Sequence, residues 1–178
     1  MNYQEVIDFW FNNQNKWFAK DRQFDCEIND KFLLLYQQAV KSELSEWRNS
    51  PLSMLALIII LDQFPRNIFR DDPRAFSSDK LALSLTKKAL ELGFNKKMPD
   101  KNHLKFLYMP LMHSEDLPDQ ELSLKLFKEL QDEISYGHAK AHHDIILRFD
   151  RFPHRNKILN RKSTTQEIEF LTEPNSSF

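Results

Sequence analysis

The chain contains very little glycine, with only Gly93 and Gly137 among its 178 residues. Parallel α/β folds and β-sandwiches use glycine in tight turns, bulges and phosphate-binding loops. Two isolated glycines exclude a G-x-G-x-x-G loop, a P-loop and a G-x-S-x-G nucleophile turn. Valine and threonine, which favour strands, are also scarce, since two valines and four threonines stand against twenty-four leucines. This composition predicts an all-α protein.

Cysteine, surplus charge and long apolar runs are scarce as well. The single cysteine, Cys26, excludes an intrachain disulfide and is typical of a reducing compartment. The net charge of −1 lacks the basic excess that nucleic-acid binders usually carry. The longest apolar run, Met54–Leu61, has eight residues and is too short to cross a membrane, and the N-terminal segment does not resemble a signal peptide. We therefore expect a cytoplasmic protein with no nucleic-acid partner and no membrane contact.

Apolar residues recur at helical spacing along most of the chain, and capping residues and prolines divide them into about eight helices. The pair Ser50-Pro51 predicts the start of a helix that runs to about Gln63. This helix is apolar on nearly all sides, so we expect it to be the central helix of the core. Nothing in the sequence resembles a linker between domains, and residues 1–178 are therefore predicted to form a single helical domain.

Further local signals set the ends of other predicted helices. Gly93 is expected to end one helix, and Pro110 to halt or bend the next. The segment Thr164–Glu167 matches a capping box that opens the last helix. After Pro118, apolar residues repeat every four positions as far as Ile134. These signals set the predicted helix ends, and polar segments lie at several of them.

Three polar segments lie beside prolines that terminate helices, namely 62–70, 108–116 and 142–161. Helix ends leave backbone groups unpaired, and side chains there can converge on a ligand. Arginine offers a forked set of donors to a carboxylate or phosphate. We therefore expect the three segments to converge on a site for a small anionic ligand or an acidic peptide. Its predicted residues are Asp62, Arg66, Asn67, His113, Glu115, Asp116, His142, Arg151, His154, Arg155 and Asn156.

Three alternatives compete with this interpretation. The arginines could pair with nearby carboxylates and brace helix ends without binding any ligand; we favour bracing for Arg155 and a ligand cavity for His113. The chain could be a hydrolase in which His113 or His142 acts as general base, oriented by Glu115 or Asp116. It could also be a structural scaffold. No H-E-x-x-H spacing is present, so neither a metal site nor a cofactor is expected.

At these polar segments the sequence resembles a known family over almost its whole length. The matching stretches are Asp8–Phe11, Trp17–Asp21, Leu55–Arg70, Ala75-Phe76, Asp79, Tyr108–Glu121, His142, Arg151–Asn156 and Ser163-Thr164. In this order they resemble the uncharacterised, mainly bacterial family called domain of unknown function 924. The resemblance implies an all-helical fold of the tetratricopeptide-like α/α superhelical kind. It implies no catalytic residues, because the family has no established activity.

The chain departs from the family pattern at two positions. Asp150 stands where the family usually has a glycine before the R-F-P-H-R-N motif, and Asn160 replaces a second glycine before Arg161. Glycine adopts left-handed backbone conformations at no steric cost. The two replacements therefore put in doubt the tight turns that glycine would allow there.

Overall fold

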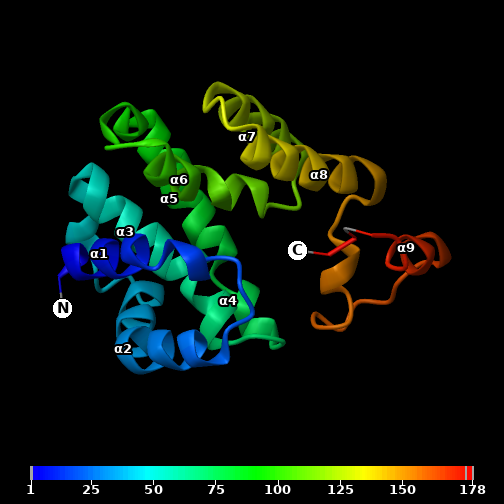
Figure 1. The fold of residues 1–178 in the computed structure, drawn as a ribbon, viewed down its shortest axis with the longest axis horizontal. Helices are drawn as coiled ribbons and strands as arrows, with labels where there is room; N and C mark the ends of the chain where they lie inside the picture. Colours follow the sequence, from blue (N-terminus) through cyan, green and yellow to red (C-terminus); the bar gives the residue numbers. More distant parts are fainter. Residues whose placement is uncertain (1, 175, 178) are drawn as a thin grey trace. The chain divides into compact units, whose positions relative to one another are not determined.

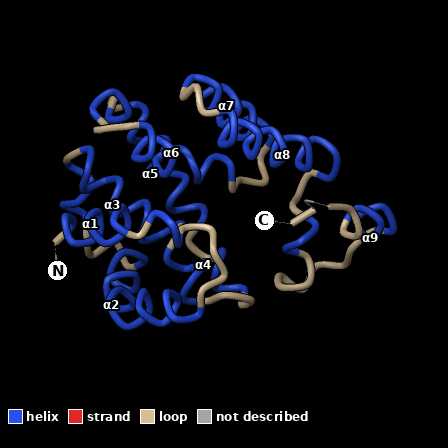
Figure 2. The backbone as a smooth tube through the Cα atoms, viewed as in Figure 1, coloured by secondary structure: helices blue, strands red, loops and turns tan. Residues whose placement is uncertain are grey.

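The computed structural model describes residues 2–174 and 176–177. Its regular structure is helical, and Figure 2 shows no strand in this described part of the chain. The predicted all-α fold is therefore confirmed. The α-helices are α1 (Tyr3–Asn12), α2 (Arg22–Val40), α3 (Pro51–Asp62), α4 (Phe64–Ile68), α5 (Asp79–Glu91), α6 (Lys101–Met112), α7 (Leu117–Glu129), α8 (Glu133–Phe149) and α9 (Thr165–Phe170). Short 3₁₀ helices cover Gln14–Lys16, Ser45–Asn49, Pro73–Phe76, Phe94–Lys97 and Pro153–Arg155.

The chain folds into two compact units, which are described separately. The first unit contains the described residues up to Arg70 together with Arg74–Pro110. The second contains Asp71–Pro73 and the described residues from Leu111 onward. The predicted organisation as a single domain stays a prediction. None of the described helices is long and apolar enough to cross a membrane.

Helix α3 is the central helix of the first unit. Every residue from Met54 to Asp62 is at most 2% exposed, as its uniformly apolar sequence predicts. Helices α1, α2 and α5 pack against it (Figure 1). Aromatic side chains fill the space between these helices, with ring centroids 5.3 Å apart for Trp10 and Phe106 and 4.7 Å apart for Phe32 and Phe64. This core holds the end of α3, where the first polar segment begins.

Prolines shape the helix ends in two different ways. Helix α3 ends at Asp62, and the short helix α4 starts again at Phe64 with Pro65 in its first turn. Helix α6 continues through Pro110 to Met112, so the prediction that this proline halts the helix is wrong. A bend at Pro110, the other predicted effect, stays a prediction. Gly93 follows α5 with a left-handed φ of 67°, as predicted for a helix-ending glycine.

Helices α7 and α8 form a hairpin in the second unit, drawn in yellow and ochre in Figure 1. The apolar repeat after Pro118 does not continue as one helix to Ile134. Instead α7 ends at Glu129, Gln131 takes a left-handed φ of 52°, and α8 begins at Glu133. The Asp132 side chain caps α8 by accepting a 3.2 Å hydrogen bond from the backbone N–H of Ser135. Ile134 is consequently 76% exposed.

The two positions without the expected glycine keep left-handed turns. Asp150 has φ 56° and Asn160 has φ 53°. Asp and Asn enter this region more readily than other residues with a side chain, because their short polar groups form local hydrogen bonds. Beyond these turns, the predicted capping box of α9 is confirmed: Thr164 and Glu167 bond each other's backbone N–H.

Candidate functional site

The first polar segment forms an ion-pair network inside the first unit. The Arg66 guanidinium donates to the two carboxylate oxygens of Asp79 at 2.9 and 3.2 Å and to the carbonyl of Asp62 at 2.8 Å. Its second partner is the buried Asp62 carboxylate, 3.7 Å away. Burial would lower the pKa of Arg66, but the charges of Asp79 and Asp62 raise it overall. These contacts favour the bracing interpretation for Asp62 and Arg66.

A second network ties α2 to the segment after α4. Asp25 accepts hydrogen bonds from Asn67 Nδ2 at 2.8 Å and from Arg70 Nε and an Arg70 terminal nitrogen at 2.8 and 2.7 Å. Burial would raise the pKa of Asp25, but these hydrogen bonds and the Arg70 charge lower it overall. Asn67 is therefore also engaged by the protein itself.

Glu115 is held by a clamp in the second unit. Its carboxylate accepts two hydrogen bonds from the forked guanidinium of Arg161, at 2.7 and 2.9 Å, and one from the backbone N–H of Phe152 at 2.7 Å. Arg161 also donates to the Phe152 carbonyl at 3.1 Å. Burial would raise the pKa of Glu115, but the bonds from Arg161 and Phe152 and the charges of Arg161 and Arg155 lower it. The clamp fixes the chain around Phe152.

Arg151 makes a second forked pair, with Glu167 of α9. Arg151 Nε and a terminal nitrogen donate to the two Glu167 oxygens at 2.6 and 2.7 Å, and the same terminal nitrogen donates to the Lys162 carbonyl at 3.0 Å. The Arg151 bond lowers the pKa of Glu167 to about 2, although burial opposes this shift. Because Glu167 also caps α9, this pair anchors that short helix to the end of α8.

Two histidines lie beside the buried ring of Phe152, and a third lies next to one of them. The ring centroid of His142 lies 5.4 Å from that of Phe152 and 6.3 Å from that of His113, and the His154 ring lies 5.6 Å from Phe152. The guanidinium of Arg155 covers the same phenyl ring at 4.6 Å. His142 and Arg155 are each only 6% exposed. The structure thus brings four of the predicted site residues into one cluster, which we call the histidine cluster.

The electrostatics of the histidine cluster disfavour added positive charge. Burial lowers the pKa of His142 to about 3, and His113, Arg155 and His154 act in the same direction. Burial also lowers the pKa of His154 to about 4, with Arg155, His113 and Arg161 adding to the shift and Glu115 opposing it. Both imidazoles are therefore neutral near pH 7. His142 Nδ1 lies 2.8 Å from the carbonyl of His138. This acceptor places the proton on Nδ1 and leaves Nε2 as a lone-pair acceptor.

Two further predicted residues, Asn156 and Asp116, do not belong to the histidine cluster. Asn156 is 1% exposed and donates to Ser163 Oγ at 3.1 Å, while its Oδ1 has no hydrogen-bond partner among the described residues. Asp116 is exposed at the start of α7 and makes no side-chain cap. No group of His, Cys, Asp or Glu in the described part of the chain is arranged to hold a metal ion. The predicted convergence of Arg66 with His113 and Arg155 stays a prediction.

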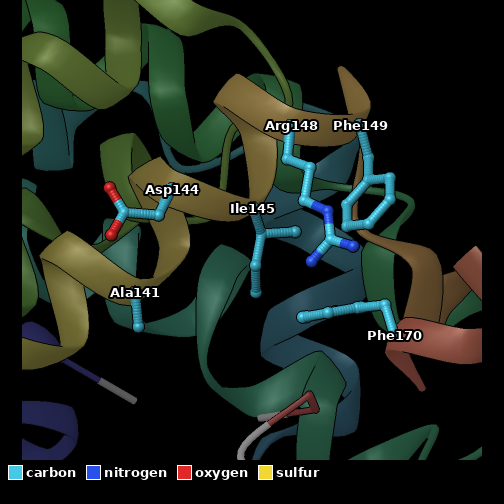
Figure 3. Close-up of a pocket in the computed structure, with 6 residues that line it drawn as sticks. All are labelled: Ala141, Asp144, Ile145, Arg148, Phe149 and Phe170. Atoms are coloured by element: carbon cyan, nitrogen blue, oxygen red, sulfur yellow. The ribbon is translucent and has the colours of Figure 1, made fainter. Parts of the chain in front are cut away.

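The second unit also contains two neighbouring hollows beside α8 and α9. The first has a volume of about 200 Å³ and is lined by Ala141, Asp144, Ile145, Arg148, Phe149 and Phe170 (Figure 3). The second has about 360 Å³ and is lined by Arg148, Phe149, Asp150, Arg151, Thr164, Gln166 and Glu167. Of the predicted site residues, Arg151 alone lines either hollow. The apolar one was missed because its walls look like ordinary helix-packing residues in the sequence.

Comparison with known proteins agrees with this architecture. The model of a family of bacterial proteins of unknown function, DUF924, matches residues 6–175. The chain belongs to this family. The solved structure of a protein of unknown function, ATU0120 from Agrobacterium tumefaciens, superimposes on this chain with a TM-score of 0.91. The two sequences are 36% identical. The match covers 96% of each chain. No curated protein matches the chain.

Proposed function

We propose that this DUF924 protein is a binding module for a small anion, with the histidine cluster of the second unit as its site. The observation that carries the proposal is the gathering of His142, His154 and the Arg155 guanidinium around the buried ring of Phe152. Burial is the main cause of the low pKa values of His142 and His154, and the positive charge of Arg155 adds to it. An anion would offset that charge. Arg155, beside the same phenyl ring, adds a guanidinium whose charge attracts an anion.

The contacts of Glu115 and the pKa of His142 both favour binding over hydrolysis. Both carboxylate oxygens of Glu115 accept hydrogen bonds from Arg161, and one also accepts from Phe152. Glu115 is therefore engaged elsewhere and does not orient a histidine. A pKa of about 3 makes His142 a weak base near pH 7, whereas an efficient general base has a pKa near the working pH. The polar segment around Arg66 acts as a brace in this proposal.

Thermal melting with inorganic phosphate tests the proposal. A ligand present at 100 times its Kd stabilises the folded state by about 2.7 kcal/mol. For a chain of this length, this raises Tm by roughly 5–11 °C. We expect the shift in the parent protein and its loss in Arg155→Gln and His154→Gln. His143→Gln is the matched control, because His143 lies next to His142 on α8 but pairs with Asp144.

Two outcomes would count against the proposal. The first is an unchanged Tm with each of phosphate, sulfate and citrate. The second is a phosphate shift that survives in Arg155→Gln, which would place the anion elsewhere. The free energy of unfolding of Arg155→Ala without ligand gives independent information. The interpretation of Arg155 as a buried brace predicts a loss of about 3–5 kcal/mol, whereas the anion-site proposal predicts that its removal costs little.

A further inference from the structure

We propose a second binding site, in the apolar hollow between α8 and α9, for a small monocarboxylate that carries a ring-sized apolar group. The hollow has an apolar wall made by Ala141, Ile145 and Phe170 and an exposed cation, Arg148, at its rim (Figure 3). This site is separate from the histidine cluster, because it involves none of that cluster's side chains. The proposal is therefore independent of the proposed function.

The Arg148 guanidinium is held in place by two aromatic rings. Its Cζ lies 4.7 Å from the ring centroid of Phe149 and 5.5 Å from that of Phe170. Figure 3 shows the guanidinium beside the Phe149 ring and extending towards Phe170. Contacts of this kind orient a guanidinium without using its N–H donors. The rings therefore reduce the conformational entropy that binding would cost.

The donors of Arg148 are available to a ligand. Within residues 2–174 and 176–177, no carboxylate forms an ion pair with this guanidinium. By contrast, Arg66, Arg151 and Arg161 each pair with a carboxylate. Asp144 lies one turn earlier on α8, but its carboxylate pairs with Lys140 and His143. In Figure 3 the Asp144 carboxylate points away from Arg148. An oriented guanidinium with free forked donors is complementary to a carboxylate.

The size and lining of the hollow define the rest of the ligand. The hollow is open to solvent and has a volume of about 200 Å³, which is on the order of the volume that accepts one benzene ring in a closed apolar cavity, roughly 150 Å³. Ile145 is 6% exposed and Phe170 is 9% exposed, so the wall is part of the packed core and is already formed. One aromatic ring or a branched aliphatic group of similar size fits this space. The carboxylate would then meet Arg148 at the rim.

Binding of phenylacetate to the full chain, followed by ¹H–¹⁵N NMR, tests this inference. For a ligand of this size we expect a Kd on the order of 1 mM, with shifts confined to amides of α8 and α9. Arg148→Gln should weaken binding about tenfold or more, because it removes the charge and the fork. Arg148→Lys should weaken it less. Arg22→Gln, at an exposed arginine of α2, is the matched control and should bind like the parent.

Three comparison ligands define the chemistry. Acetate and benzyl alcohol should each bind much more weakly than phenylacetate, because one lacks the apolar group and the other lacks the charge. Asp144→Asn should bind phenylacetate at least as tightly as the parent, because it removes a carboxylate from the rim. An acetylated peptide that ends in a free phenylalanine carboxylate should bind no more tightly than phenylacetate.

Each opposite result would overturn the inference. Unchanged phenylacetate affinity in Arg148→Gln would show that the guanidinium does not bind the ligand, provided that far-ultraviolet circular dichroism shows a parent-like fold. Equal binding of benzyl alcohol would remove the role of the carboxylate. Much tighter binding of the peptide would replace a small-molecule ligand with a polypeptide C-terminus. Retention of the phosphate response in Arg148→Gln would distinguish this site from the histidine cluster.

Discussion

Replacing Glu115 with alanine should destabilise the protein by about 3 kcal/mol. The substitution removes the acceptor for two hydrogen bonds from Arg161, at 2.7 and 2.9 Å, and for the backbone N–H of Phe152 at 2.7 Å. Breaking a buried ion pair costs about 3–5 kcal/mol because the remaining charge is left without its partner. The side chains of Glu115 and Arg161 are 28% and 24% exposed, so water can compensate in part and the low end applies.

Thermal melting and urea denaturation measure this loss. For a chain of this length, about 3 kcal/mol corresponds to a fall in Tm of roughly 6–12 °C. Glu115→Gln should lose less, because the amide oxygen can still accept from Phe152. Glu121→Ala, at an exposed glutamate of α7, is the control and should change the Tm little. A fall below about 2 °C in Glu115→Ala would refute the reasoning, since it would mean that the clamp contributes almost nothing to stability.

Three further predictions concern stability. The folded-state pKa values of His142 and His154, about 3 and about 4, lie below their usual value of 6.5. The unfolded state therefore gains protons first as pH falls, and the free energy of unfolding should decrease below pH 6.5, by at most about 1.4 kcal/mol per pH unit for each histidine. Urea denaturation at pH 7 and pH 5 should show a smaller decrease in His142→Gln than in the parent. An equal decrease in both proteins would contradict the low pKa of His142. Asp150 has φ 56°, so Asp150→Gly should change the free energy of unfolding by no more than about 1 kcal/mol. Asp150→Val should cost more than that, because its branched side chain clashes in this conformation. Equal melting temperatures for the two variants would argue against the left-handed turn. Arg66→Ala removes the ion-pair partner of two carboxylates, one of them in the core, and should cost about 3 kcal/mol or more. A parent-like Tm would exclude the bracing role.

The local features of the fold could be predicted from the sequence alone. Helix α3 is apolar on all sides, and such a helix is stable in water only when other elements surround it. The capping box of Thr164 and Glu167 satisfies backbone groups within four residues of each other. The scarcity of glycine, valine and threonine favoured helices as the main regular structure. Each of these inferences depends on residues that are close in sequence.

The sequence also identified the polar segments but could not assign their partners. Arg161 and Glu115 pair across 46 residues, and Arg151 and Glu167 pair across 16. Either arginine has many carboxylates within reach of a flexible chain. A forked pair needs both groups at hydrogen-bond distance and in one plane, and only the packing of α7, α8 and α9 supplies that orientation.

The histidine cluster and the apolar hollow were decided by tertiary structure for the same reason. Burial of His142 and His154 lowers their pKa values, and burial is a property of the packed fold. In the sequence Arg148 is one arginine among nine, and only the fold places Phe170 of α9 beside it. Periodicity along the chain therefore determined which residues face a core. The electrostatic potential at a side chain and the space beside it depend on neighbours that are distant in sequence. Only the folded chain brings those neighbours together.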